Sequence, residues 1–295
     1  MQDTAEKRPA LVGVAEEKTT LLPFLLAHVA GKSRNNVKSM LSGGQFLVNG
    51  RARKRHDCPL APGDRVELLP RQEKPAPALP FPVLYEDRDI IVIDKPAGLL
   101  TIANEREKVR TAYHMLRAYR EEKERGGRVF VVHRLDRDTS GVVLFAKNEE
   151  TKLAFQEAWD RRVLRRGYRA VVEGVPPKAQ DRLVSYLRET KTHLVYAGGP
   201  GGDAREAVTR YQVIAAGGGY ALLDIDLETG RKNQIRVQLA EIGCPIAGDR
   251  QYGAESRPLG RLCLHAHELR LEDPRTGEVR TFSAREPAAF RRLCR

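Results

Sequence analysis

The sequence predicts an α+β fold: a large domain with a mixed, mainly antiparallel β-sheet flanked by helices and loops, and a small α/β domain before it. Two observations lead to this prediction. Runs rich in β-branched residues follow one another, often without the helix that a parallel crossover would need between them. A stretch with five prolines over residues 70–82 separates a strongly basic N-terminal part from the rest of the chain.

The chain of 295 residues is long enough for two domains. We expect a flexible tail over residues 1–17, a small basic domain over 18–70, a linker over 71–82 and a large domain over 83–295. The expected tail is polar and the expected linker is rich in proline, whereas both domains alternate apolar runs with turn residues.

The small domain is expected to begin with two helices. An apolar stretch over residues 21–30 predicts the first, and Ser33 is a suitable N-cap for a second helix over 34–41. Apolar runs and turn signals predict the later elements: a strand over 45–48, a hairpin turn at Asn49-Gly50, a basic run over 51–55, and a strand over 65–69.

In the large domain, β-rich apolar runs predict the strands, and longer mixed runs predict the helices. Helices are expected over residues 111–125, 150–161 and 233–241. The predicted strands cover residues 83–85, 90–94, 129–132, 142–146, 168–173, 207–214 and 221–227.

The distribution of charge narrows the class of partner. The net charge is +12, and half of it lies in residues 18–70, which hold nine Lys or Arg against three Asp or Glu. Such a cluster favours a polyanionic partner, nucleic acid before an anionic membrane surface. A solvated basic face that serves only solubility is the alternative.

Other features argue against several classes of protein. The four cysteines lie far apart without CxxC spacing, which disfavours a zinc site or a disulfide framework. The polar N-terminus lacks the apolar core of a signal peptide, and no run is long enough to cross a membrane. We therefore expect a cytoplasmic protein without a metal site, with a monomer as the default state.

The segment His133-Arg134-Leu135-Asp136-Arg137-Asp138-Thr139-Ser140-Gly141 is the most informative part of the chain. It lies between two apolar runs, so we expect a polar loop held between two strands. Loops on a rigid scaffold often carry catalytic groups. The segment resembles the HRLDxxTSG signature of RluA-type RNA pseudouridine synthases.

Four further segments resemble motifs of the same family in the same order. They are residues 83–99 with a Lys95-Pro96-Ala97-Gly98 turn, 166–174, 229–237 and 264–278. The resemblance implies a pseudouridine synthase domain that uses no cofactor, with Asp136 as its catalytic aspartate. It likewise implies that Tyr168 and Arg236 are the active-site tyrosine and arginine. Departures from the common pattern at Thr101 and Lys232-Asn233 bear on the target RNA and not on the reaction.

The chemistry of uridine isomerisation suits these side chains. The N1–C1′ bond must break, the base must turn, and C5 must join C1′. An ionised carboxylate can attack C1′ or C6 or remove a 2′ proton, and the sequence leaves these routes open. A nearby guanidinium lowers a carboxylate pKa by about 1–3 units, and we expect Arg236 to pair with Asp136. Tyr168 offers a ring for stacking and a hydroxyl for proton transfer.

A uridine in structured RNA is stacked, so the target must flip out of its helix. Arg134 is expected to contact a phosphate or to fill the gap that the base leaves. Arg165 and Arg166 are expected to hold flanking phosphates. The structural alternatives are an ordinary salt bridge for Arg236, a half-buried strand tyrosine for Tyr168 and a solvated helix end for the arginine run.

The order of elements in residues 18–70 resembles the RNA-binding domain named after ribosomal protein S-four. In that fold the second helix and the following hairpin present cations to structured RNA. The candidate contacts are Lys32, Arg34, Asn35, Lys38, Arg51, Arg53, Lys54 and Arg55. Family members with this extra domain often act on large-subunit ribosomal RNA, which we therefore expect as the substrate, with transfer RNA as the alternative.

Two other functions are considered. A non-catalytic RNA-binding or ribosome-assembly factor on the same fold would have no need of Asp136, Tyr168 and Arg236 together. A carbohydrate hydrolase that uses Asp136 and Asp138 would need carboxylates on both sides of a glycosidic bond, which two residues in one loop seldom supply.

Overall fold

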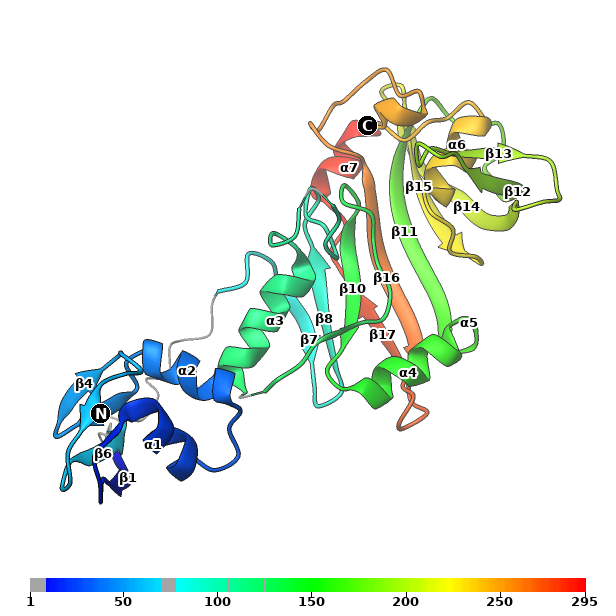
Figure 1. Cartoon of the computed structure of the whole chain (residues 1–295). Coiled ribbons are helices and arrows are strands. Elements are labelled where there is room, and N and C mark those ends of the chain that lie inside the picture. Colours follow the sequence, from blue (N-terminus) through cyan, green and yellow to red (C-terminus); the bar gives the residue numbers. More distant parts are fainter. Residues whose placement is uncertain (1–8, 70–77, 106, 125) are drawn as a thin grey trace, which may run out of the picture. The chain divides into compact units, whose positions relative to one another are not determined.

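The computed structural model describes residues 9–69, 78–105, 107–124 and 126–295 (Figure 1). The chain forms two compact units, residues 1–74 and 75–295, and each is described by itself. Residues 1–8 of the expected tail and residues 70–77, which include most of the expected linker, lie outside the described residues. Among the helices described, none is both long and apolar enough to span a membrane.

The N-terminal unit packs two helices against short strands. The helices are α1 (Leu21–His28) and α2 (Arg34–Ser42), and their buried residues surround Phe46. One sheet has the order β1-β6-β3-β4, and a second pairs β2 with β5. The strands are β1 (Ala10–Val14), β2 (Thr19–Thr20), β3 (Phe46–Val48), β4 (Arg51–Arg53), β5 (Pro59–Leu60) and β6 (Arg65–Leu68).

Two local predictions for this unit are confirmed. The Ser33 hydroxyl caps α2 by accepting a hydrogen bond from the Asn36 amide at 3.3 Å. Asn49 and Gly50 have φ values of 50° and 75°, as a tight hairpin turn between β3 and β4 requires.

The expectation of a flexible tail up to residue 17 is wrong for residues 10–14. These residues form β1, which pairs antiparallel with β6 from Ala10 opposite Leu68 to Val14 opposite Arg65. Val12 packs against the core of the unit. A short apolar run that looks isolated in the sequence thus completes the sheet, because β6 has a free edge for it.

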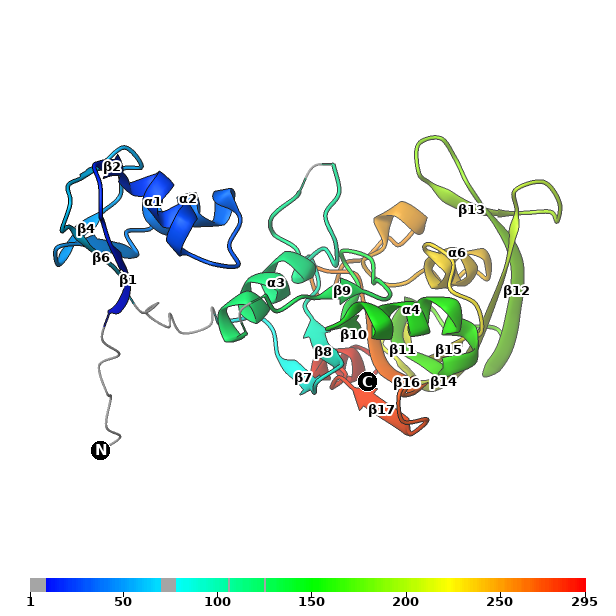
Figure 2. The ribbon, with the colours of Figure 1, turned by 60° about the horizontal axis from the view of Figure 1, so that its bottom comes forward.

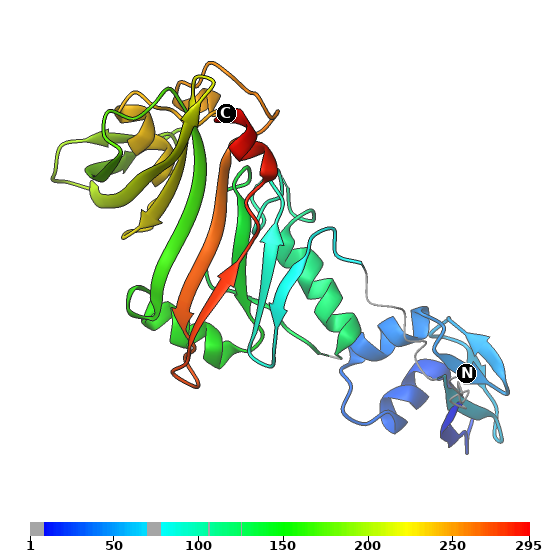
Figure 3. The same cartoon turned by 180° about the vertical axis from the view of Figure 1, so that it is seen from behind.

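The larger unit is built on an 11-stranded sheet with the order β13-β12-β14-β15-β11-β16-β10-β8-β7, to which β17 and β9 add at β16 and β10 (Figures 1 and 3). Every pair described is antiparallel except β10 with β16, which confirms a mixed, mainly antiparallel sheet. The strands are β7 (Val83–Glu86), β8 (Ile90–Lys95), β9 (Phe130–Val131), β10 (Ser140–Ala146), β11 (Val163–Glu173), β12 (Gln180–Glu189), β13 (Val195–Gly198), β14 (Arg205–Gly217), β15 (Tyr220–Leu227), β16 (Leu264–Glu272) and β17 (Val279–Ser283).

The helices of this unit lie close to the predicted positions. The helix expected over 150–161 is two helices, α4 (Glu149–Glu157) and α5 (Trp159–Arg162), because the helical conformation is interrupted at Ala158. The sequence did not predict α7 (Ala288–Leu293), β12, β13 or β17. The helices are α3 (Ala112–Lys123), α4 (Glu149–Glu157), α5 (Trp159–Arg162), α6 (Gln234–Glu241) and α7 (Ala288–Leu293), with a 3-10 turn at Arg250–Tyr252.

Alternation along β8 shows how the sheet is packed. Ile91 and Ile93 share a hydrophobic cluster with Leu116 of α3, whereas Ile90 and Val92 share another with Phe155 of α4. Successive side chains of a strand point to opposite faces, so α3 and α4 cover different faces of β8. Strands β12 and β13 lie at the other end of the sheet, beside α6 (Figure 2). This packing holds both strands that flank the nine-residue loop.

Candidate active site

A cleft of about 650 Å³ in the larger unit gathers the three predicted catalytic side chains. Asp136 comes from the loop between β9 and β10, Tyr168 from β11 and Arg236 from α6. The volume lies within the range of roughly 300–1,000 Å³ that is typical of small-ligand sites. The fold therefore brings three distant sequence motifs to one cavity.

The Asp136 carboxylate is half-buried and makes no hydrogen bond or ion pair with any residue that the structure describes. The backbone around it is held, because the Thr139 amide donates to the Asp136 carbonyl at 3.3 Å. Asp136 is also close enough to Arg236 and Tyr168 for its charge to affect the pKa of both. The carboxylate oxygens are thus presented to the cleft on a fixed loop.

Two buried side chains, one at the end of β8 and one in the segment after it, hold this loop. The Thr101 hydroxyl donates to the Leu135 carbonyl at 2.8 Å and accepts from the Leu135 amide at 3.2 Å. The Lys95 ammonium donates to the carbonyls of Leu99 at 2.7 Å and Arg137 at 3.1 Å, and also to that of Pro96. Sequence reasoning assigned no role to either side chain.

The environment of Lys95 is strongly desolvating. Burial lowers the pKa of Lys95 to about 7, although the negative charges of Asp138 and Asp136 favour its protonated form. The only signal in the sequence was a lysine at the end of an apolar strand, which is an unusual place for a charge. Lys95 ties the strand end to the loop that carries Asp136.

The end of the nine-residue segment is explained by close packing. Gly141 has a φ of 116°, and a Cβ at this position would collide with the backbone carbonyl of Ala266 on β16. The Ser140 hydroxyl lies 2.8 Å from His265 Nδ1 and accepts from Arg261 Nη2 at 2.6 Å. Ser140 and Gly141 therefore position the loop against β16, where β10 and β16 pair in parallel.

Tyr168 lies where two parts of the core meet. Its ring packs against both the α3 side of the core and the cluster under β15 and α6. Burial raises the pKa of Tyr168 to about 12, with the positive charge of Arg166 opposing this shift and the negative charge of Asp136 adding to it. The phenol is therefore protonated at neutral pH.

Arg236 is not paired as expected. Its guanidinium makes a bidentate ion pair with Asp249, with Nε–Oδ2 at 2.6 Å and Nη2–Oδ1 at 2.7 Å. It also donates to Asn233 Oδ1 at 3.0 Å and stacks over the Tyr252 ring. A direct Asp136–Arg236 pair is therefore a wrong prediction, because buried Asp249 already takes the guanidinium fork.

The charge of Asp136 nevertheless reaches Arg236. Burial works against the charged guanidinium, but the hydrogen bonds and charge of Asp249, together with the charge of Asp136, raise the pKa of Arg236. Asp249 thus holds a permanent cation in the wall of the cleft. The sequence analysis missed Asp249, which lies outside the segments that resemble the family motifs. The local signal at this position was the dipeptide Gly248-Asp249, which is typical of a turn.

The predicted RNA-contacting arginines fall in different places. Arg134 is exposed at the cleft, and Arg166 lines it while donating to the carbonyls of Leu227 and Glu228. Arg165 does not line the cleft, and it pairs with Glu268 at 2.9 Å and Asp224 at 3.3 Å. Neighbouring residues of a strand face opposite ways, so Arg165 and Arg166 cannot share a surface on β11.

In the N-terminal unit, the candidate cations lie just before α2, on α2, on β4 and just after β4. Lys32 is half-buried, whereas the other candidate residues are exposed. Arg55 pairs with Asp57 at 2.7 Å. The exposed members without an ion pair among the described residues are Arg34, Lys38, Arg51, Arg53 and Lys54, with Asn35 beside them.

The hairpin between β12 and β13 supplies a wall of the cleft that the sequence did not predict. Glu189 and His193 line the cleft together with Lys232. Lys232 Nζ lies 2.5 Å from Glu189 Oε1, so this contact joins the hairpin to the segment before α6. Among the described residues, no group of three His, Cys, Asp or Glu side chains is placed to hold a metal ion.

Comparison with known proteins finds relatives that are described as RNA pseudouridine synthases. The family model for RNA pseudouridylate synthase matches residues 89–241. An uncharacterized RNA pseudouridine synthase of Chloroflexus aurantiacus is 34% identical over 298 aligned residues, covering 96% of this chain and 92% of the relative. A ribosomal large subunit pseudouridine synthase D of Xanthomonas campestris is 33% identical, with 88% of this chain and 83% of the relative covered.

A solved structure shows the same fold. The human RNA Pseudouridylate Synthase Domain Containing 4 protein superposes with a TM-score of 0.60 at 24% identity. The match covers 72% of this chain and 92% of the human chain.

Proposed function

The chain belongs to the RNA pseudouridylate synthase family, and we propose that it converts specific uridines of structured RNA to pseudouridine with Asp136 as the catalytic carboxylate. The observation that carries this assignment is the Asp136 carboxylate in the cleft, without a hydrogen-bond or ion-pair partner among the described residues. A carboxylate that the protein does not neutralise is available to attack carbon or to accept a proton.

The reaction is an isomerisation. The N1–C1′ bond breaks, the base turns, C5 bonds to C1′, C5 loses its proton and N1 gains one. Three first steps are open to Asp136: attack at C1′, attack at C6, or removal of the 2′ proton. All three need the carboxylate as a nucleophile or base, and the Arg236 guanidinium places a positive charge in the wall of the same cleft.

Tyr168 and the cleft suit a flipped base. The Tyr168 ring lines the cleft and can stack on a pyrimidine, and its protonated hydroxyl can donate a hydrogen bond. Extrusion of the uridine costs a few kcal/mol of stacking and pairing. Arg134 at the cleft and Arg166 within it can offset part of this cost through phosphate contacts.

We further propose that the N-terminal unit binds RNA in the manner of the domain named after ribosomal protein S-four. The exposed cations of α2 and β4 support this, since no described carboxylate pairs with Arg34, Lys38, Arg51 or Arg53. The Xanthomonas campestris relative is named for the large ribosomal subunit, so we propose large-subunit ribosomal RNA as the substrate. This substrate also implies a cytoplasmic site of action.

The first experiment replaces Asp136 with Asn, which removes the charge and keeps the shape. We expect pseudouridine formation on a large-subunit ribosomal RNA transcript to fall on the order of 10³-fold or more, while RNA binding is retained. The matched control is Asp138→Asn in the same loop, because Asp138 already pairs with Arg137 at 3.2 Å. We expect this control to keep its rate within about tenfold.

Conversion by the Asp136→Asn variant at an undiminished rate would contradict the role of Asp136. Binding without conversion by the wild type, on both ribosomal and transfer RNA transcripts, would instead support a non-catalytic RNA-binding factor. Conversion of transfer RNA alone would replace the proposed substrate and leave the reaction standing.

The N-terminal proposal has its own test. Neutralising Arg51 and Arg53 together should weaken RNA binding and flatten its salt dependence by about 0.9 in log–log slope for each lost phosphate contact. The exposed Arg270 of β16 serves as the control position in the other unit. An unchanged slope in the Arg51→Ala, Arg53→Ala variant would show that this face does not bind RNA.

A further inference from the structure

The loop that joins β12 to β13 is held in one shape by its own hydrogen bonds. The Thr190 amide donates to the Leu194 carbonyl at 2.8 Å, and the His193 amide donates to the Thr190 carbonyl at 2.9 Å. His193 is held in the left-handed region with a φ of 65°. Because the backbone is fixed in this way, any adjustment at this side of the cleft comes from side chains.

At this loop, one carboxylate collects two donors. Glu189 Oε1 lies 2.5 Å from Lys232 Nζ and 2.6 Å from His193 Nδ1. Lys232 Nζ also donates to the His193 carbonyl at 3.2 Å. The hydrogen bonds from Lys232 and then His193 lower the pKa of Glu189, so the carboxylate is ionised at neutral pH.

The same donors match a phosphodiester. A lysine ammonium and an imidazole N–H that converge on one oxygen bind a phosphate oxygen as well as a carboxylate oxygen. The neighbouring Arg231 adds an exposed cation that pairs with no described carboxylate; its Nε donates to the Glu206 carbonyl at 3.0 Å. Positive charge is therefore concentrated where the hairpin meets the segment before α6.

The contact is also easy to exchange. The side chains of Glu189 and Lys232 are 40% and 39% exposed, and that of His193 is 80% exposed. Exposed ion pairs add little to stability, because water and salt screen them. An incoming anion can thus displace the Glu189 carboxylate without unfolding the hairpin.

We propose that Lys232 and His193 form a binding site for a backbone phosphate of the substrate RNA, and that the Glu189 carboxylate occupies this site until RNA displaces it. The inference rests on the proposed function, and it names the part of the RNA that this wall of the cleft receives. A nucleotide that enters the cleft brings its flanking phosphates to the residues around it. Glu189 then lowers the affinity for the RNA, because the incoming phosphate has to displace the carboxylate from Lys232 and His193.

The test is a double-mutant cycle on RNA affinity, with Glu189→Gln, Lys232→Met and the two combined. The probe is the large-subunit ribosomal RNA transcript, and binding is measured at several salt concentrations. We expect Glu189→Gln to tighten binding about three- to tenfold at low salt and Lys232→Met to weaken it by a similar factor. Lys232→Met should also reduce the salt slope by about 0.9.

The coupling between the two positions separates this site from general charge effects. In the Lys232→Met background, Glu189→Gln should change RNA affinity less than twofold. The control Glu121→Gln removes an exposed carboxylate of α3 that has no ion pair among the described residues, and it should also change affinity less than twofold. Thermal melting of each variant verifies that the fold is kept.

Equal tightening by Glu189→Gln in both backgrounds, or no tightening at all, would overturn the proposal. Weaker binding by Glu189→Gln would do so too, because Glu189 would then only fix the hairpin. Pseudouridine formation by the wild type is scored separately. Its absence on both ribosomal and transfer RNA transcripts would refute the proposed reaction, whereas the affinity cycle would still decide whether Lys232 binds a phosphate.

Discussion

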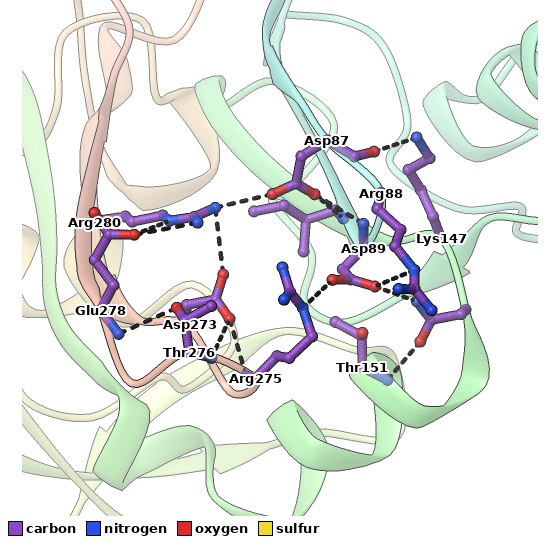
Figure 4. A network of polar contacts seen from close by, with 12 residues as sticks. Asp87, Arg88, Asp89, Lys147, Thr151, Asp273, Arg275, Thr276, Glu278 and Arg280 are labelled. Atoms are coloured by element: carbon purple, nitrogen blue, oxygen red, sulfur yellow. Dashed lines mark hydrogen bonds and ion pairs between the residues drawn. The ribbon is translucent and has the colours of Figure 1, made fainter.

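Carboxylates have opposite surroundings in two regions of the larger unit. The first is the cleft around Asp136. The second is a polar network between the β7–β8 turn, the start of α4 and the β16–β17 hairpin (Figure 4). The network is formed by Asp87, Arg88, Asp89, Lys147, Asn148, Thr151, Asp273, Arg275, Thr276, Glu278 and Arg280.

In the network, each buried carboxylate has several donors. Asp87 accepts from the amides of Asp89 and Ile90, both at 2.8 Å, and from Arg280 Nη1 at 2.9 Å. Asp89 accepts from Arg275 Nε at 2.7 Å and from Asn148 Nδ2 at 2.9 Å. These bonds connect three segments that are far apart in the sequence, so they contribute to the stability of the fold.

At the cleft, two carboxylates differ in the same respect. Asp249 is saturated by Arg236, as the network acids are by their donors, whereas Asp136 has no such partner among the described residues. A saturated carboxylate stabilises structure but has no free oxygen for a substrate. The acid that we propose to be reactive thus differs from its neighbour in the contacts that it lacks among the described residues, whereas Asp249 is distinguished by the contacts that it makes.

The largest effect is expected from Asp249→Asn. Loss of this charge leaves the Arg236 guanidinium, 14% exposed, without its bidentate partner. Removing one member of a buried ion pair costs about 3–5 kcal/mol, so we expect the free energy of unfolding to fall by about this amount. Urea denaturation measures it, and pseudouridine formation should be lost as well because Arg236 is no longer positioned. Unchanged stability and activity would show that Asp249 has no supporting role.

An effect of intermediate size for each residue involved is expected when the pH is lowered. Burial lowers the pKa of both His133 and His265 to about 4. For His133, the positive charge of Arg166 adds to this shift. The Leu144 amide donates to His133 Nε2 at 3.0 Å, which requires that nitrogen to be unprotonated. Both histidines are depressed below their unfolded pKa of about 6.5. Their stability contribution is thus present above about pH 6.5 and is lost as pH falls towards 4.

Each histidine accounts for up to about 3 kcal/mol over this interval. The measurement is the free energy of unfolding from urea titrations between pH 7 and pH 4. His265→Gln should reduce the dependence on pH, because one of the two buried groups no longer titrates. Stability that stays constant between pH 6.5 and 4.5 would contradict the neutral, buried state of both rings.

The smallest effect is expected from Asp89→Asn in the network. Arg275 is 56% exposed, so the loss should be about 2 kcal/mol, below the value for a fully buried pair. Pseudouridine formation below the melting temperature should be unaffected. Arg88→Ala is the control, because Arg88 is 87% exposed and lies 3.9 Å from Asp89, and we expect less than about 0.5 kcal/mol. Loss of activity in folded Asp89→Asn would link the network to the reaction.

Sequence reasoning predicted the elements that depend on local signals. The Asn49-Gly50 turn, the Ser33 cap and the loop between β9 and β10 all follow from residues next to one another. Strands β12 and β13 were missed because they are only partly buried and carry many polar residues. Exposed strands lack the continuous apolar run that marks a buried one.

The supporting residues of the site were harder to predict. Thr101 was seen only as a departure from the family pattern, yet its hydroxyl clamps both backbone groups of Leu135. Lys95 was seen only as part of a turn, yet it holds three carbonyls. Such roles depend on distances across the fold, and the identity of a residue does not reveal its partners.

By itself, the sequence determined the fold class, the family and the three candidate side chains, because each is encoded in a short contiguous pattern. The tertiary structure alone decided which acid pairs with Arg236 and which acid stays available. Ion pairs form between side chains that the fold brings within a few ångströms, and their energy depends on that distance and on burial. Asp136 and Asp249 are the same residue type, so only their positions in the fold separate an acid without a partner among the described residues from an acid that is paired with Arg236.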